Sequence, residues 1–184
     1  MKFYIQLTLS VLALTFFTSC TSKQAILNKN YESRPINIYG KLDSLQIVDE
    51  RDDVTDRPMF IPFLSMPDDS DMISPKLTPS QSQAITSQIR SYFKGGERDF
   101  KVKCRITKAF TEFSAKAFSE REYVHFETTI ELMDEQGVIL QSCDSAAFFE
   151  TKSMDASAKM MTMLYEKAMR VAIYKCFEKL TDRP

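Results

Sequence analysis

Two alternating segments joined by a short turn constrain the fold of this chain most strongly. The first, residues 123–132, has an apolar row made of Val124, Phe126, Thr128, Ile130 and Leu132. A turn at residues 134–137 ends in Gly137, and residues 138–149 continue as a second strand. Since neighbouring side chains on a strand point to opposite faces, each segment has one apolar and one polar face. The pattern predicts an antiparallel hairpin with one face in a hydrophobic core.

Further strands are predicted at 45–49 and 100–106, where apolar and polar residues alternate in the same way. Residues 107–120 are ambiguous, although Phe110, Phe113 and Phe118 could extend the second of these strands. A helix is predicted at 79–93, because Thr78 and Gln81 form a capping box and Pro79 suits the first helical position. A second helix is predicted at 154–180, opened by Ser153 and Asp155.

Together these segments predict a single α+β domain over residues 35–184, in the order β-α-β-β-β-α. We expect a two-layer sandwich with an antiparallel-rich sheet of about four strands and two helices on one face. The reason is that each strand has one apolar row and each helix has an apolar stripe, so every element has one side to bury.

The segment between the first strand and the first helix contains an apolar loop bounded by Pro58 and Pro67. Its prolines exclude a helix and disfavour a central strand. Five apolar side chains in it are costly to leave in water: Met59, Phe60, Ile61, Phe63 and Leu64. Two interpretations stay open, a cover over the domain's own core or a docking site for a partner. The carboxylates after it, Asp68 to Asp71, are interpreted as a solvated turn because they lack the spacing of a calcium loop.

The second helix carries more apolar surface than one stripe requires. Beside a first face that includes Leu164 and Ala172, its second half adds Met169, Ile173, Phe177 and Leu180. Either the helix is wedged between the sheet and the loop, or Ile173 and Phe177 belong to a partner-binding surface. Both interpretations stay open at this point.

The first twenty residues follow the plan of a secretory signal peptide, with Lys2, an uncharged run from Phe3 to Phe17, small residues and then Cys20. The run is too short to span a bilayer comfortably. The predicted organisation is a signal peptide over 1–19, a polar tether over 20–34, and the domain. The alternative is an ordinary signal peptide with an incidental cysteine.

Phe17-Thr18-Ser19-Cys20 resembles the lipobox of bacterial lipoproteins. Over roughly residues 35–180, the order of elements is similar to that of small α/β outer-membrane lipoproteins, among them the lipopolysaccharide-assembly lipoproteins. The resemblance implies cleavage before Cys20, acylation of Cys20 with chains such as palmitate, and a lipid anchor in the outer membrane, facing the periplasm or the cell surface. A partner, another envelope protein, is expected from the surplus apolar surface of the loop and of the second helix.

Composition narrows the function classes. Without the predicted signal, which contains one lysine, 165 residues carry 23 basic and 25 acidic side chains, so electrostatics give no case for nucleic acid. Cys104, Cys143 and Cys176 lie in apolar patterns; a Cys104–Cys143 bridge is one alternative and buried free thiols the other. No cysteine lies at a zinc spacing from the single histidine, His125, and no metal or other cofactor is expected.

No catalytic motif is present, and His125 falls on the polar face of its strand, where an exposed position is expected. We therefore expect a non-catalytic envelope lipoprotein that acts as an assembly or scaffolding subunit. The alternative is a carbohydrate-binding lipoprotein that uses aromatic rings such as Tyr39, Tyr92 and Tyr123 as platforms.

Overall fold

Three long antiparallel strands form most of the sheet in the computed structural model, which describes residues 26–27, 29–62, 64–116, 119–152 and 157–182. They are β4 (Asp99–Lys116), β5 (Ser119–Met133) and β6 (Ile139–Lys152), paired in that order. The β5–β6 turn closes with hydrogen bonds from Gly137 N to Asp134 O and from Asp134 N to Val138 O, and Gly137 has a φ of 85°. The predicted hairpin is confirmed. The elements described below all lie in one compact unit, Tyr31–Pro184.

A β-bulge at Thr107 allows β4 to continue through the ambiguous segment. The pairing with β5 shifts between Ile106 and Lys108, so that one extra residue stands on β4. Before the bulge the even-numbered Val102, Cys104 and Ile106 are buried; after it the odd-numbered Ala109, Thr111 and Phe113 are buried. Because the bulge changes the parity of the inward positions, simple alternation fails at 107, and the predicted strand end at 106 is too early.

The sheet has six strands rather than about four. Strand β1 (Lys41–Asp49) runs parallel to the first half of β4, while β3 (Ser70–Pro75) pairs antiparallel with the second half. The short β2 (Val54–Thr55) pairs with β3. β1 occupies the edge of β4 only as far as Ile106, so the rest of that edge is available to β3. The proline-rich segment therefore does supply strands, at the edge where a terminal proline is tolerated.

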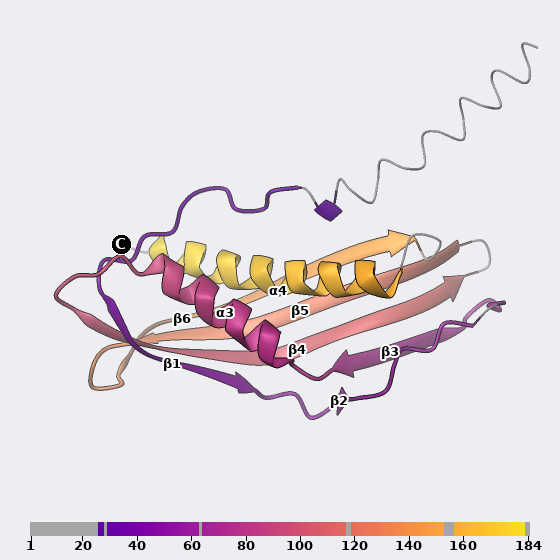
Figure 1. Ribbon diagram of the computed structural model, residues 1–184, viewed down its shortest axis with the longest axis horizontal. Helices are drawn as coiled ribbons and strands as arrows, with labels where there is room; N and C mark the ends of the chain where they lie inside the picture. Colours follow the sequence, from indigo (N-terminus) through magenta and orange to yellow (C-terminus); the bar gives the residue numbers. More distant parts are fainter. Residues whose placement is uncertain (1–25, 28, 63, 117–118, 153–156, 183–184) are drawn as a thin grey trace, which may run out of the picture. The chain divides into compact units, whose positions relative to one another are not determined.

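Both helices lie on one face of the sheet, as predicted (Figure 1). Helix α3 (Pro79–Tyr92) begins with the predicted capping box, in which Gln81 N donates to Thr78 Oγ1 at 3.2 Å and Thr78 N to Gln81 Oε1 at 3.0 Å. Helix α4 (Ala158–Thr181) packs across β5 and β6. Ser157 caps it, accepting from Met160 N at 3.2 Å. The predicted opening residues Ser153 and Asp155 lie outside the described residues.

The extra apolar stripe of α4 belongs to the core. Ile173 and Phe177 have no exposed surface, and the Phe177 ring packs against Tyr92 of α3 with ring centroids 5.0 Å apart. Their assignment to a partner-binding surface was therefore wrong. The physical reason is that α4 faces the sheet on one side and α3 on another, so a wide apolar arc is covered within the domain.

A disulfide joins α4 to the sheet. It links Cys143 on β6 to Cys176, whereas Cys104 is a buried free thiol. The Cys104–Cys143 pairing was therefore wrong, because Cys104 lies on β4 and instead contacts Thr128 of β5. Burial raises the pKa of the Cys104 thiol to about 11.

The last residues of the predicted tether are bound to α4. The Tyr174 hydroxyl donates to Arg34 O at 3.0 Å and lies 2.9 Å from Arg34 N, and the Tyr31 ring packs against Phe149 at 5.2 Å. Close packing thus begins at Tyr31, four residues before the predicted domain start. None of the helices in the described part of the chain is both long enough and apolar enough to span a bilayer.

Candidate functional site

The proline-bounded loop is held in place by a carboxylate on β3. Asp71 receives hydrogen bonds from the Arg57 guanidinium, at 2.7 Å (Nη1 to Oδ2) and 2.5 Å (Nη2 to Oδ1), and from the backbone N–H of Phe60 at 2.7 Å. Arg57 holds the pKa of the Asp71 carboxyl well down, at about 2. At the far end of the loop, Asp69 accepts a hydrogen bond from Met66 N at 2.7 Å. These carboxylates, interpreted above as a solvated turn, fix the shape of the loop.

Apolar side chains of this loop point into solvent. The exposed fractions are 68% for Phe60, 81% for Leu64 and 67% for Met66. Ile61 is 43% exposed and Met59 is half-buried. Phe63, which the sequence also placed in this group, lies outside the described residues. We call residues 58–66 the apolar loop.

A cavity of about 460 Å³ lies beneath the apolar loop. Pro58, Met59 and Ile61 form one wall, and the first turns of α3 and α4 contribute others. The remaining lining residues come from β3, the β3–α3 connection and the inner face of the sheet: Ile73, Pro75, Lys76, Thr111 and Glu122. The loop therefore covers the domain in part, through Met59 and Ile61. Phe60, Leu64 and Met66 instead remain exposed, as the docking interpretation requires.

Glu122 is the unusual residue of this cavity. It lies on the helix-facing side of β5, is only 1% exposed, and neither carboxylate oxygen has a hydrogen-bond partner among the described residues. Burial, and secondarily the charge of Glu120, raise the pKa of the Glu122 carboxyl to about 7. Sequence analysis did not single out this residue. The signal was available, because Glu122 stands two residues before Val124 and so on the apolar row of the strand.

Tyr165 of α4 brings a second polar group to the cavity. Its side chain is 3% exposed, and its hydroxyl has no partner at hydrogen-bond geometry among the described residues. Burial raises the pKa of the Tyr165 hydroxyl to about 12. The cavity therefore combines mostly apolar walls with two buried oxygen-bearing groups, a composition typical of small-molecule binding sites.

The nearby guanidinium of Arg51 is already satisfied. It makes two 2.7 Å hydrogen bonds to Asp49 and donates to Ala109 O at 2.9 Å and to Pro75 O at 3.1 Å. Arg51 thus ties the end of β1 to β3 and to β4 just after the bulge. All of these hydrogen bonds connect strand ends, so the Arg51 guanidinium has a structural role.

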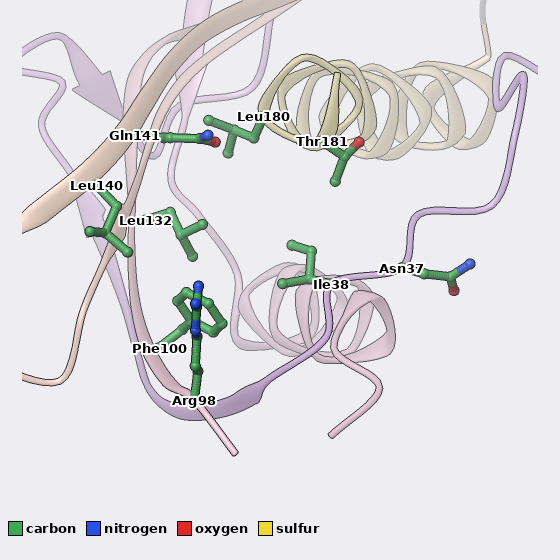
Figure 2. A pocket seen from close by; sticks show the side chains of 9 residues that line it. All are labelled: Asn37, Ile38, Arg98, Phe100, Leu132, Leu140, Gln141, Leu180 and Thr181. Atoms are coloured by element: carbon green, nitrogen blue, oxygen red, sulfur yellow. The ribbon is translucent and has the colours of Figure 1, made fainter. Parts of the chain in front are cut away.

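A second cavity, of about 360 Å³, lies at the opposite end of β4 and β5 (Figure 2). Ile38, Phe100, Leu132 and Leu180 line it, with Arg98 and Gln141 near its edge. Among the described residues, none of the buried polar atoms that lack a partner lies on its wall. It offers no buried polar anchor comparable to Glu122.

The sheet face away from the helices carries a row of aromatic rings. Phe110 stacks on His125 with centroids 5.1 Å apart, and Tyr123 stacks on Phe148 at 5.5 Å. His125 Nε2 also lies 3.3 Å from the Glu127 carboxylate, so the predicted polar-face position is confirmed while stacking leaves the side chain only 18% exposed. Of the other predicted sugar-binding rings, Tyr39 is exposed and Tyr92 is buried. The structure does not bring these three tyrosines together.

Cys20, the predicted lipidation site, lies outside the described residues. Within the described residues, no group of three or more His, Cys, Asp or Glu side chains has the geometry of a metal site.

Comparison with known proteins gives only distant likenesses. No protein-family model and no curated protein matches the sequence. Among solved structures, a minor lipoprotein from Acinetobacter baumannii is 12% identical to this chain, with a TM-score of 0.39. The aligned region covers 80% of this chain and 91% of that protein. A candidate lipoprotein from Caulobacter crescentus shares 11% with a TM-score of 0.36 (54% and 76% covered). An uncharacterized protein shares 10% with a TM-score of 0.41 (82% and 96% covered).

Proposed function

We propose that this protein is a non-catalytic, lipid-anchored protein of the bacterial envelope that binds another envelope protein through its apolar loop. The observation that carries the proposal is the exposure of Phe60, Leu64 and Met66 on a loop whose backbone is fixed by Asp71 and Asp69. Leaving such side chains in water is costly, and fixing them in advance reduces the entropy lost on binding. A partner with an apolar groove would remove these side chains from water and would lose little conformational entropy of the loop on binding.

Charge around the loop favours a protein over a membrane surface as its target. Residues 50–71 contain seven acidic and two basic side chains. Anionic lipid headgroups would repel such a segment, whereas a protein groove with a basic rim would attract it. The partner that fits is therefore an envelope protein with an apolar groove flanked by lysine or arginine. An assembly or scaffolding role is the form of this function that needs only an anchor and one docking surface.

The anchor in this proposal is an acyl-modified Cys20 in the outer membrane. It is supported by the signal-like segment that ends at this residue, and acyl chains gain about 0.8 kcal/mol for each buried CH₂ group. The intact mass of the native protein tests it. We expect a chain beginning at Cys20 with added acyl mass, and expect Cys20→Ser to abolish membrane fractionation. An unmodified amino terminus would contradict the anchor.

The docking role is tested by co-purification from detergent-solubilised membranes. Phe60→Ser combined with Leu64→Ser should remove the partner that co-purifies with the wild type, because both side chains are exposed and their loss costs the domain little. The control is Val138→Ser with Leu140→Ser. These two exposed apolar residues lie at the start of β6, at the opposite end of the sheet from the apolar loop. A partner that is retained by the loop variant would contradict the proposal, as would one lost equally from the control.

A second candidate function is carbohydrate binding on the open face of the sheet. The stacked pair Tyr123 and Phe148 favours it, because Phe148 remains 54% exposed beside a second ring and presents a flat apolar platform of the kind that sugar rings cover. Affinity electrophoresis in gels containing envelope polysaccharides tests it. Retardation that Phe148→Ala abolishes would support sugar binding, and unchanged mobility in every gel would exclude it.

A further inference from the structure

The cavity beneath the apolar loop contains a buried carboxylate that has no hydrogen-bond partner in the described part of the chain. Glu122 faces the cavity from β5, between Phe113 on β4 and Thr151 on β6, which are both buried. Neither of its oxygens receives a hydrogen bond from the described residues. Since buried polar groups are nearly always satisfied in folded proteins, an unsatisfied carboxylate on a cavity wall indicates a missing donor.

The charged groups near Glu122 do not supply that donor. The Arg51 guanidinium is directed to Asp49, Ala109 O and Pro75 O. Among the described residues that line the cavity, Lys76 is the one basic residue, and it is exposed. From β5 itself, Glu120 adds a second negative charge. From α4, Tyr165 contributes a neutral hydroxyl, which lies near the Arg51 guanidinium and has no partner at hydrogen-bond geometry among the described residues.

The remaining walls are suited to an apolar body. Met59 and Ile61 face the cavity from the loop, Ile73 from β3, and Met161 from α4. A volume of about 460 Å³ lies in the range of about 300–1,000 Å³ that is usual for small-molecule sites. The cavity thus combines room for a small apolar group with one buried acceptor.

We propose that this cavity binds a small apolar primary amine, whose ammonium group donates hydrogen bonds to the Glu122 carboxylate and whose hydrocarbon part lies against Met59, Ile61 and Met161. An ammonium group supplies three donors and a positive charge, which matches a carboxylate whose two oxygens have no hydrogen-bond partner among the described residues. This inference goes beyond the protein-binding role, because the ligand occupies the inner side of the loop and the proposed partner its outer side.

Three molecules with the same ring test the chemistry of the site: cyclohexylmethylamine, cyclohexylmethanol and cyclohexanecarboxylate. Each is titrated into the full-length protein carrying ¹³C-methyl methionine, and the shifts of Met59 and Met161 are followed, with Met133 as an internal reference. We expect the amine to give saturable shifts at Met59 and Met161, at least tenfold tighter than the alcohol. The carboxylate should give none. Met133 lies at the opposite end of β5 and should not respond.

Glu122→Gln is the decisive variant, because it keeps the shape of the side chain and removes its charge. It should lower the affinity for the amine at least tenfold and leave the affinity for the alcohol unchanged. Glu127→Gln, on the same strand but on the opposite face, is the matched control and should bind the amine as the wild type does.

The pH dependence of the wild type gives an independent test that needs no variant. With the Glu122 pKa at about 7, the ionised fraction increases about tenfold between pH 6 and pH 8, so the affinity for the amine should increase by about the same factor. Lys76, Tyr165, Arg51 and Glu120 are the other titratable groups near the site, and burial raises the pKa of Tyr165 to about 12, far above this window.

Three results would overturn the inference: no saturable shift at Met59 and Met161, equal affinity for amine and alcohol in the wild type, or preferred binding of the carboxylate, which would assign the site to Lys76. An affinity for the amine that is independent of pH would overturn it as well. Loss of the docking partner in the loop variant does not bear on these outcomes, so the two proposals can fail separately.

Discussion

The guanidinium of Arg57 and the carboxylate of Asp71 form a two-point ion pair, with hydrogen bonds of 2.7 and 2.5 Å, across fourteen residues of sequence. The pair joins the start of the apolar loop to β3, and Asp71 also accepts from Phe60 N at 2.7 Å. One carboxylate therefore determines where Phe60 is presented. This relationship connects the edge of the sheet to the proposed docking surface.

Asp71→Asn should release the loop without unfolding the domain. The amide can no longer form the charged two-point pair, but Arg57 is half exposed, so the effect on the melting temperature should be small. Hydrogen exchange at Phe60 N should become at least tenfold faster. Arg121→Ala, which removes the exposed Arg121–Glu150 pair, is the control and should leave this amide protected. Unchanged protection at Phe60 in Asp71→Asn would show that other contacts hold the loop.

The same ion pair should weaken in acid. The folded-state pKa of Asp71, about 2, is lower than its ordinary value of 3.8, so its contribution to stability is present above pH 4 and is lost as the pH falls towards 2. Exchange at Phe60 N, corrected for the intrinsic pH dependence, should therefore accelerate over that window. Protection that persists to pH 2 would contradict the stabilisation of the ionised Asp71.

Glu122→Gln should stabilise the protein in a pH-dependent way. Because folding raises the pKa of Glu122 from 4.5 to about 7, the folded state retains a proton that the unfolded state loses, and the free energy of unfolding decreases as the pH rises from 4.5 to 7. The variant lacks this penalty. Urea titrations should show it to be more stable by about 3 kcal/mol at pH 8 and by close to nothing at pH 4. Equal stability at both pH values would indicate that Glu122 meets a donor in the folded protein.

Phe177→Ala should destabilise the domain strongly. The ring is fully buried against Tyr92, and removing a buried phenylalanine side chain costs about 3–5 kcal/mol. Met163→Ala, at a 42% exposed position of the same helix, is the control and should cost less than about 1 kcal/mol. A small effect of Phe177→Ala would restore the docking interpretation of this stripe.

Some parts of the fold were predictable because local chemistry alone fixes them. The capping box of Thr78 and Gln81 and the turn ending in Gly137 depend on residues close in sequence, and both are confirmed. The bulge at Thr107 was not predictable, because nothing in its neighbours marks the extra residue and only the pairing with β5 reveals it. The same applies to β3, which pairs with the part of the β4 edge that β1 leaves uncovered beyond Ile106.

In the candidate site too, some features could be predicted from the sequence and others could not. Phe60 and Leu64 were among the five apolar side chains that the sequence singled out, but their spacing left open whether they cover the core, and only the structure shows that both are exposed. The role of Asp71 depends on an ion pair with a residue across the loop, which spacing does not reveal. The stripe of Ile173 and Phe177 misled the prediction because the sequence does not show that α3 covers α4.

A photoreactive residue at position 60 or 64, introduced in place of Phe60 or Leu64 and irradiated in intact cells, tests the docking role most directly. The account predicts one discrete adduct of higher mass from both positions. It predicts no such adduct from Val138, which is exposed to a similar degree at the far end of the sheet. The same adduct from position 138, or none from positions 60 and 64, would contradict the claim that the apolar loop is a docking surface.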